Sequence, residues 1–147
     1  MDNLWDRFDN IVTPKEVDDA KAQFDPFEAG EYECILEAIE AGESKDGLPM
    51  LKGKFRVIEN NRILFYNQML QNLNYPNMTA VNVAEAVKFI DGLTGEEVIF
   101  TSLGKLAERV TNMKTGGQYI IEVAYGKKDL EMKFPKLKVV EAIEVPF

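Results

Sequence analysis

Histidine is absent from the sequence, and with it the commonest general base and the commonest zinc ligand of proteins. Mechanisms that pair a serine or cysteine nucleophile with a histidine are therefore excluded. Cys34 is the only cysteine, so neither an internal disulfide nor a zinc site of clustered cysteines can form. No compact acidic cluster stands beside a glycine-rich phosphate-binding loop. These absences predict a protein that is not an enzyme and that holds no metal ion and no cofactor.

Long apolar runs are missing as well. No stretch approaches the roughly 18 apolar residues that a membrane-spanning helix needs. The first residues are acidic and do not have the basic start and apolar centre of a secretion signal. We therefore expect a cytoplasmic protein with no membrane partner.

What the chain does contain fits one globular domain. It has 147 residues, 46% of them apolar and 29% charged, which is enough for one core and close to the average for folded proteins. The net charge is −8, but it is unevenly distributed. Residues 1–47 carry 14 acidic against 4 basic side chains, whereas residues 102–138 carry 8 basic against 4 acidic ones. The charge of the first part suits a basic partner, and the charge of the later part suits an acidic partner.

The first 26 residues form an acidic N-terminal extension in our interpretation. Apolar residues from Leu4 to Val12 recur at helical spacing, which predicts a short amphipathic helix. Thr13 followed by Pro14 is typical of a helix start and predicts a second short helix to about Ala22. We assign residues 1–26 to this helical extension and residues 27–147 to a β-rich domain.

From Gly30 onward the apolar residues alternate with a period of two, which indicates strands. Strands are predicted over residues 30–39, 51–57, 62–69, 118–125 and 130–144, with Pro135 indicating an edge or a bulge in the last one. Two helices are predicted between the third and fourth strands, at residues 79–90 and from Ser102 to before Gly116. This order predicts a mainly β (α+β) fold, a five-stranded OB-like Greek-key barrel with a helical insertion between strands 3 and 4.

Three segments carry a family resemblance: Phe27–Tyr32, Ser44–Leu51 and Lys54–Val57. Together they resemble small phage- and prophage-encoded proteins found among recombination and replication genes. The resemblance implies an OB-like barrel that binds single-stranded DNA in a bacterial host cell. It also implies a protein partner such as a phage recombinase or replication protein. The oligomeric state is left open, with a homo-oligomer among the alternatives.

The C-terminal segment, Glu141–Phe147, is similar to the acidic tip of bacterial single-stranded DNA-binding proteins. The similarity implies that Glu144, Pro146 and Phe147 recruit other replication proteins. No long linker precedes this segment and it holds only two acidic residues. The alternative is therefore the end of the last strand, with Phe147 buried.

Single-stranded DNA is held by cations that follow the phosphates and by aromatic rings on which bases stack. OB folds use the surface of strands 2 and 3 and the loop between strands 4 and 5. The candidate residues in these places are Lys52, Lys54, Arg56, Arg62, Tyr66, Lys127, Lys128, Phe134, Lys136 and Lys138, with Tyr75 in the irregular stretch after strand 3. We expect the groups at 52–62 and 127–138 to converge on one open channel.

Other interpretations of these residues are open. The cations of strand 2 can pair with Glu33 and Glu37 across a hairpin, with Glu37 opposite Lys52. Phe55 and Phe65 share apolar faces, so we assign both to the core. The rival function is an acidic module that binds a basic protein partner, by mimicry of nucleic acid, without binding DNA. A structural component of a virion is a third alternative.

Overall fold

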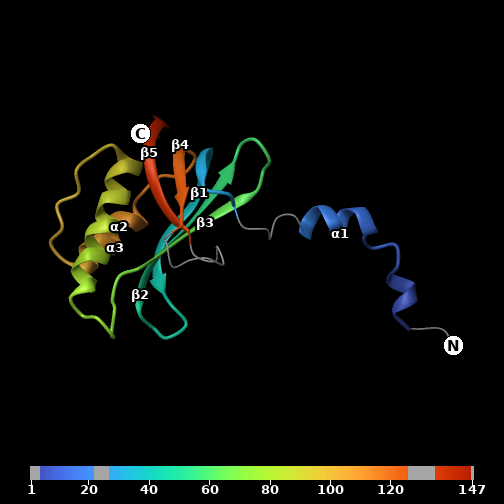
Figure 1. The fold of residues 1–147 in the computed structure, drawn as a ribbon, viewed down its shortest axis with the longest axis horizontal. Helices are drawn as coiled ribbons and strands as arrows, with labels where there is room; N and C mark the ends of the chain where they lie inside the picture. The colour runs from blue at the N-terminus through green and yellow to red at the C-terminus, as the bar shows by residue number, and fades with distance from the viewer. Residues whose placement is uncertain (1–3, 22–26, 126–134, 147) are drawn as a thin grey trace.

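The structure is a computed structural model that describes residues 4–21, 27–125 and 135–146 (Figure 1). Its elements are η1 (Leu4–Phe8), α1 (Pro14–Lys21), β1 (Gly30–Glu43), β2 (Pro49–Val57), β3 (Ile63–Met69), α2 (Met78–Thr94), α3 (Leu103–Thr111), β4 (Gln118–Ala124) and β5 (Lys136–Glu144). The predicted order of three strands, two helices and two further strands is confirmed. The mainly β, α+β class is therefore correct.

All five strands form one antiparallel sheet in the order β3-β2-β1-β4-β5. The long strand β1 lies in the centre, because its first half pairs with β4 and most of its length pairs with β2. Within the described residues, the edge strands β3 and β5 do not pair with each other, so this sheet is open. The predicted barrel is not confirmed.

Helices α2 and α3 cover one face of the sheet, which we call the inner face (Figure 1). Strand β2 shows how the sequence fixes this face, because its buried and outward residues alternate along the whole strand. Phe55 of β2 is fully buried and contacts Phe89 of α2 edge to face, with ring centroids 6.0 Å apart. The opposite side of the sheet, the outer face, is not covered by either helix.

Strand β1 contains an irregularity that alternation alone does not reveal. The pairing with β2 shifts between Leu36 and Ala38, so that Glu37 is an extra residue, as in a β-bulge. Before the shift, Cys34 and Leu36 are buried, whereas after it Ile39 packs against the core and Ala38 is exposed. The prediction that Ala38 shares a face with Cys34 and Leu36 is wrong, because one extra residue reverses the two faces.

Helix α2 lies close to the edge strand β5 and also contacts β3. The closest approach occurs at Gly92, where an added Cβ atom would lie 2.7 Å from Cβ of Val139. Since real Cβ atoms do not come so near, a glycine is required for this helix to pack at this distance. The helix therefore packs beside both open edges of the sheet.

The described N-terminal segment, residues 4–21, is exposed to solvent. Every described side chain of residues 4–21 is exposed, and η1 and α1 lie apart from the sheet in Figure 1. The predicted helix start at Thr13 is confirmed. Thr13 Oγ1 accepts a hydrogen bond from the Glu16 N–H at 3.1 Å, and Glu16 Oε1 accepts one from the Thr13 N–H at 3.2 Å.

Candidate nucleic-acid interface

The three predicted cations of β2 all lie on the outer face of the sheet, at alternate positions of the strand. On β3, the residues opposite Lys52, Lys54 and Arg56 are Asn67, Phe65 and Ile63. On β1, the residues opposite Lys52 and Lys54 are Glu40 and Ala38, and Ile35 is opposite Arg56. The side of the cations toward β3 is therefore uncharged, and carboxylates lie on the side toward β1.

In the part of the chain that the structure describes, one of the three cations has a carboxylate partner. Arg56 forms an ion pair with Glu37 through Nε and donates from Nη1 to Asn61 Oδ1 at 3.3 Å. Among the described residues, neither Lys52 nor Lys54 forms an ion pair. The alternative ion pair between Glu37 and Lys52 does not form, because the turn at residues 44–48 places Glu40 opposite Lys52. Two free ammonium groups remain on this surface.

The two aromatic residues of β3 face opposite ways. Phe65 points outward with 55% of its surface exposed, so its assignment to the core is wrong. Tyr66 is 4% exposed and stacks on Phe89 of α2, with ring centroids 3.9 Å apart and planes 5° apart. Burial raises the pKa of Tyr66 above its ordinary value, and Glu85 adds to the effect. In this conformation Phe65, and not the predicted Tyr66, is the ring of β3 that a base can reach.

A glycine on β2 indicates which face of the sheet Tyr66 occupies. Gly53 is directly opposite Tyr66, and a Cβ added to it would lie 3.3 Å from Cβ of Tyr66. Aromatic rings can cover strand glycines, and Gly53 alternates in phase with the buried Leu51 and Phe55. The pair Gly53 and Tyr66 therefore indicates the inner face, which leaves Phe65 for the outer one.

Arg62 precedes β3 and binds an aromatic ring. Its guanidinium carbon lies 4.1 Å from the centroid of the buried Phe27 ring, which is a cation–π contact. Arg62 thus fixes the segment that leads into β1.

Tyr75 lies in the connection from β3 to α2 and is 66% exposed. Asn72 orders this turn, because its Oδ1 accepts hydrogen bonds from the N–H groups of Asn74 and Tyr75, at 3.1 and 2.9 Å. Thr79 lies in the first turn of α2, which was predicted over residues 79–90. The helix begins one residue earlier, and Thr79 Oγ1 accepts a hydrogen bond from the Asn72 N–H at 3.0 Å. Figure 1 shows this connection at the same end of the molecule as the turn between β1 and β2.

The cations of β5 lie far from those of β2. Lys138 is opposite Glu122 of β4, and the Lys136 ammonium lies 3.9 Å from Glu85 Oε1 of α2. Strands β1 and β4 separate β5 from β2, which is three strand spacings or about 14 Å. The outer face of the intervening strands carries the exposed glutamates 31, 33, 37 and 40. The expected convergence into one channel is therefore wrong for Lys136 and Lys138, and Lys127, Lys128 and Phe134 lie outside the described residues.

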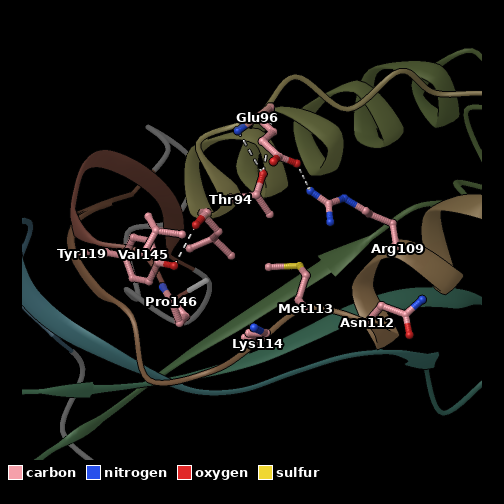
Figure 2. A pocket seen from close by; sticks show the side chains of 10 residues that line it. Thr94, Glu96, Arg109, Asn112, Met113, Lys114, Tyr119, Val145 and Pro146 are labelled. Carbon is pink, nitrogen blue, oxygen red and sulfur yellow. Dashed lines mark hydrogen bonds and ion pairs between the residues drawn. The ribbon is translucent and has the colours of Figure 1, made fainter.

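The predicted partner-binding segment at the C-terminus packs against the rest of the protein as far as residue 146. Val145 packs against the core, and Glu144 is an exposed residue opposite Gln118. Pro146 lines an open cavity of about 220 Å³ at the ends of α2 and α3 (Figure 2). A Cβ on Gly117 would lie 2.9 Å from both the Glu144 carbonyl oxygen and Pro146 Cδ, so the segment packs closely against the chain before β4. Phe147 lies outside the described residues.

The same cavity contains a closed ion pair. Arg109 Nη2 lies 2.8 Å from Glu96 Oε2, and the Tyr119 hydroxyl donates to the Leu93 carbonyl oxygen at 2.7 Å (Figure 2). Both polar groups are therefore satisfied within the protein. The lining of this cavity gives no reason to prefer it over the outer face of β2 and β3 as a ligand site.

Two further findings concern the described part of the chain. It contains no group of three or more Cys, Asp or Glu side chains placed to hold a metal ion. Of its helices, none has both the length and the apolar character required to cross a bilayer. Comparison with known proteins finds no matching family model and no matching curated protein.

Proposed function

We propose that this protein binds single-stranded DNA, without a chemical step, on the outer face of β2 and β3. The observation that carries the proposal is the pair Lys54 and Phe65, which lie directly opposite each other on that face. Phe65 offers an exposed ring for a base, and Lys54 offers a free ammonium beside it for a phosphate. Lys52, two residues along β2, supplies a second free ammonium.

The arrangement of the strands supports an OB-like fold for this purpose. Strand β1 pairs with both β2 and β4, so that β3 and β5 become the two edges of a sheet that a barrel would close. Helix α2 contacts both of these edges from the inner face. OB folds bind oligonucleotides on the surface of strands 2 and 3, which is the surface that carries Phe65 and Lys54 here.

The carboxylates of β1 limit the path of a bound strand. Glu40 lies opposite Lys52, and Glu37 already neutralises Arg56, so phosphates are repelled on the β1 side of these cations. The uncharged β3 side offers no such repulsion. A DNA strand therefore follows β2 and β3 and places few phosphates on the protein.

The salt dependence of binding tests whether the protein contacts only a few phosphates. Each neutralised phosphate of a single strand contributes about −0.7 to the slope of log K against log salt concentration. Two lysines therefore predict a slope of about −1.4, measured by fluorescence anisotropy with a labelled oligothymidine. The double substitution of Lys52 and Lys54 by Gln should remove most of this slope, whereas Lys105→Gln on α3 should leave it unchanged. A slope that Lys52→Gln/Lys54→Gln does not alter would contradict the site.

Aromatic stacking is tested with a matched pair of exposed phenylalanines. Phe65→Ala should weaken binding by about 1–3 kcal/mol, or about 5- to 150-fold, because it removes the stacking ring. Phe100 is also exposed, at 45%, but lies outside the described elements of the sheet, so Phe100→Ala should bind as the unchanged protein does. Equal affinities of the two variants would exclude Phe65 as the platform.

A second candidate function rests on the acidic surface of β1. Glutamates 31, 33, 37 and 40 are exposed along one strand, and every described side chain of the preceding residues 4–21 is exposed as well. Such a surface is suited to a basic protein partner. This function predicts no binding of any oligonucleotide at low salt, so the same titration distinguishes it from the first.

A further inference from the structure

The two edges of the sheet differ in how well they are protected against pairing with another strand. Natural edge strands avoid such pairing with charges, prolines and bulges. The β5 edge has all three: Pro135 directly precedes the strand, Lys136 and Lys138 lie on it, and its register with β4 shifts twice. The β3 edge has none of these three, because Ile63–Met69 contains no charge and no proline and pairs with β2 without a shift, although α2 contacts the strand.

The backbone of β3 alternates in the direction of its hydrogen-bonding groups. The Val57 N–H donates to the Arg62 carbonyl oxygen at 2.8 Å, and the Leu70 N–H donates to the Pro49 carbonyl oxygen at 3.1 Å. In an antiparallel ladder, bonded pairs recur at every second residue. The even-numbered residues of β3 therefore bond to β2, and the backbone groups of the odd-numbered Ile63, Phe65, Asn67 and Met69 point away from the sheet.

We propose that two copies of the chain pair through their β3 edges, antiparallel, about a twofold axis at Phe65. In this register Phe65 lies opposite Phe65 of the second copy, and Ile63 lies opposite Asn67. Ile63, Phe65 and Asn67 then form three bonded pairs across the axis, each of which exchanges two hydrogen bonds. No like charges meet, because the strand carries none. A twofold contact of this kind closes on itself, so it gives a dimer and not a filament.

The dimer brings a residue of the second copy into the DNA site, and in that respect it deepens the proposed function. The outer face becomes continuous across the axis, with Lys54 and Phe65 of one copy followed by Phe65 and Lys54 of the other. Neighbouring strands lie about 4.8 Å apart, so the two rings form one stacking platform between two ammonium groups. The pairing itself rests on the β3 edge alone and is measured without DNA.

Light scattering coupled to gel filtration tests the dimer directly. We expect the mass of two chains for the unchanged protein and for Asn67→Ala, and the mass of one chain for Asn67→Pro. Proline at 67 removes an N–H that points away from β2, so it blocks the edge without breaking the ladder inside the sheet. A monomeric unchanged protein, or an Asn67→Pro variant that is still dimeric, would overturn the proposal.

Cysteine cross-linking tests the register and does not depend on how proline affects folding. Bonded residues opposite each other have Cα atoms about 5.5 Å apart, within the range that a disulfide spans. Phe65→Cys should therefore form a covalent dimer on oxidation. The two copies of residue 67 lie four residues apart along the strand, about 13 Å, so Asn67→Cys should not cross-link. The native Cys34 is fully buried and does not interfere. Cross-linking at 67 but not at 65 would exclude this axis.

The two proposals fail in distinguishable ways. Lys52→Gln/Lys54→Gln should lose DNA binding and remain a dimer, since neither side chain lies at the β3 edge. A dimer that binds no DNA leaves the edge pairing intact and refutes the DNA site. A monomer that binds DNA through Phe65 refutes the edge pairing and leaves the DNA site intact.

Discussion

The same substitution, glycine to alanine, should have opposite effects at two helical positions of this protein. Gly92 lies inside α2, where an added Cβ would be 2.7 Å from Cβ of Val139 on β5. Gly104 lies in α3, where the nearest atom to an added Cβ is Ser102 Oγ at 3.9 Å. Gly92→Ala therefore tests how closely α2 packs on the edge strand, and Gly104→Ala is its matched control.

The magnitudes follow from two competing terms. Alanine is favoured over glycine in a helix by up to about 1 kcal/mol, and Gly104→Ala should gain most of this because its Cβ enters open space. At Gly92 the contact is 0.7 Å shorter than the 3.4 Å at which ordinary contacts begin. Val139 Cβ cannot rotate away, so helix or strand must shift, which costs about 2–3 kcal/mol. Gly92→Ala should therefore lose about 1–2 kcal/mol net.

Urea unfolding followed by far-ultraviolet circular dichroism measures both free energies. Fluorescence is less suitable, because the single tryptophan, Trp5, is 75% exposed in the N-terminal segment and does not report on the core. We expect the midpoint of Gly92→Ala below that of the unchanged protein and the midpoint of Gly104→Ala above it. If both variants were more stable, α2 would not pack on β5 at the distance described here.

Two further predictions concern buried polar groups. The Tyr66 hydroxyl is buried with no partner among the described residues, so Tyr66→Phe should leave the free energy of unfolding unchanged or raise it by up to about 1 kcal/mol. Tyr119→Phe should lower the free energy of unfolding by about 1–2 kcal/mol, because it removes the hydrogen bond to the Leu93 carbonyl oxygen. Thermal unfolding compares the two, and a larger loss for Tyr66→Phe would contradict the assignment. Burial raises the pKa of Cys34 to about 12, with the nearby Glu33 adding to it, so the thiol should not react with a disulfide reagent near pH 8 until the protein unfolds. Because the folded pKa of Cys34 lies above the unfolded value of about 8.5, the neutral thiol's contribution to stability is complete below pH 8.5 and is lost as the pH rises toward 12. In urea titrations over this pH range, Cys34→Ala should therefore lose less stability than the unchanged protein.

The sequence was sufficient for the order of the elements and for the faces of β2. Strict alternation in β2 places its three cations outward, because the side-chain period of a strand is two. The faces of β3 were harder, since Leu64, Phe65 and Tyr66 are all large and apolar in character, and periodicity cannot tell which of them meets the helices. Only the pairing of Tyr66 with Gly53 resolves this.

The long-range features of the site depend on register and strand order, which local patterns do not contain. Glu37 is an ordinary strand residue by composition, yet it is the extra residue of the bulge, and its carboxylate pairs with Arg56. Similarly, the cations of β5 looked like part of one channel, because nothing in the sequence shows that β1 and β4 lie between β5 and β2. Pairing of distant segments is a property of the folded sheet and is read only from its topology.

The position of the helices explains why the DNA site and the β3 edge fall in one region. Since α2 and α3 cover the inner face, a ligand that binds the sheet must use the outer face. There the glutamates of β1 separate the cations of β2 from those of β5, so among the described residues of this face a free ammonium and an exposed ring lie directly opposite each other at Lys54 and Phe65. Phe65 also lies on the unprotected edge. A second copy added at β3 would therefore extend the surface on the one side where no carboxylate interrupts it.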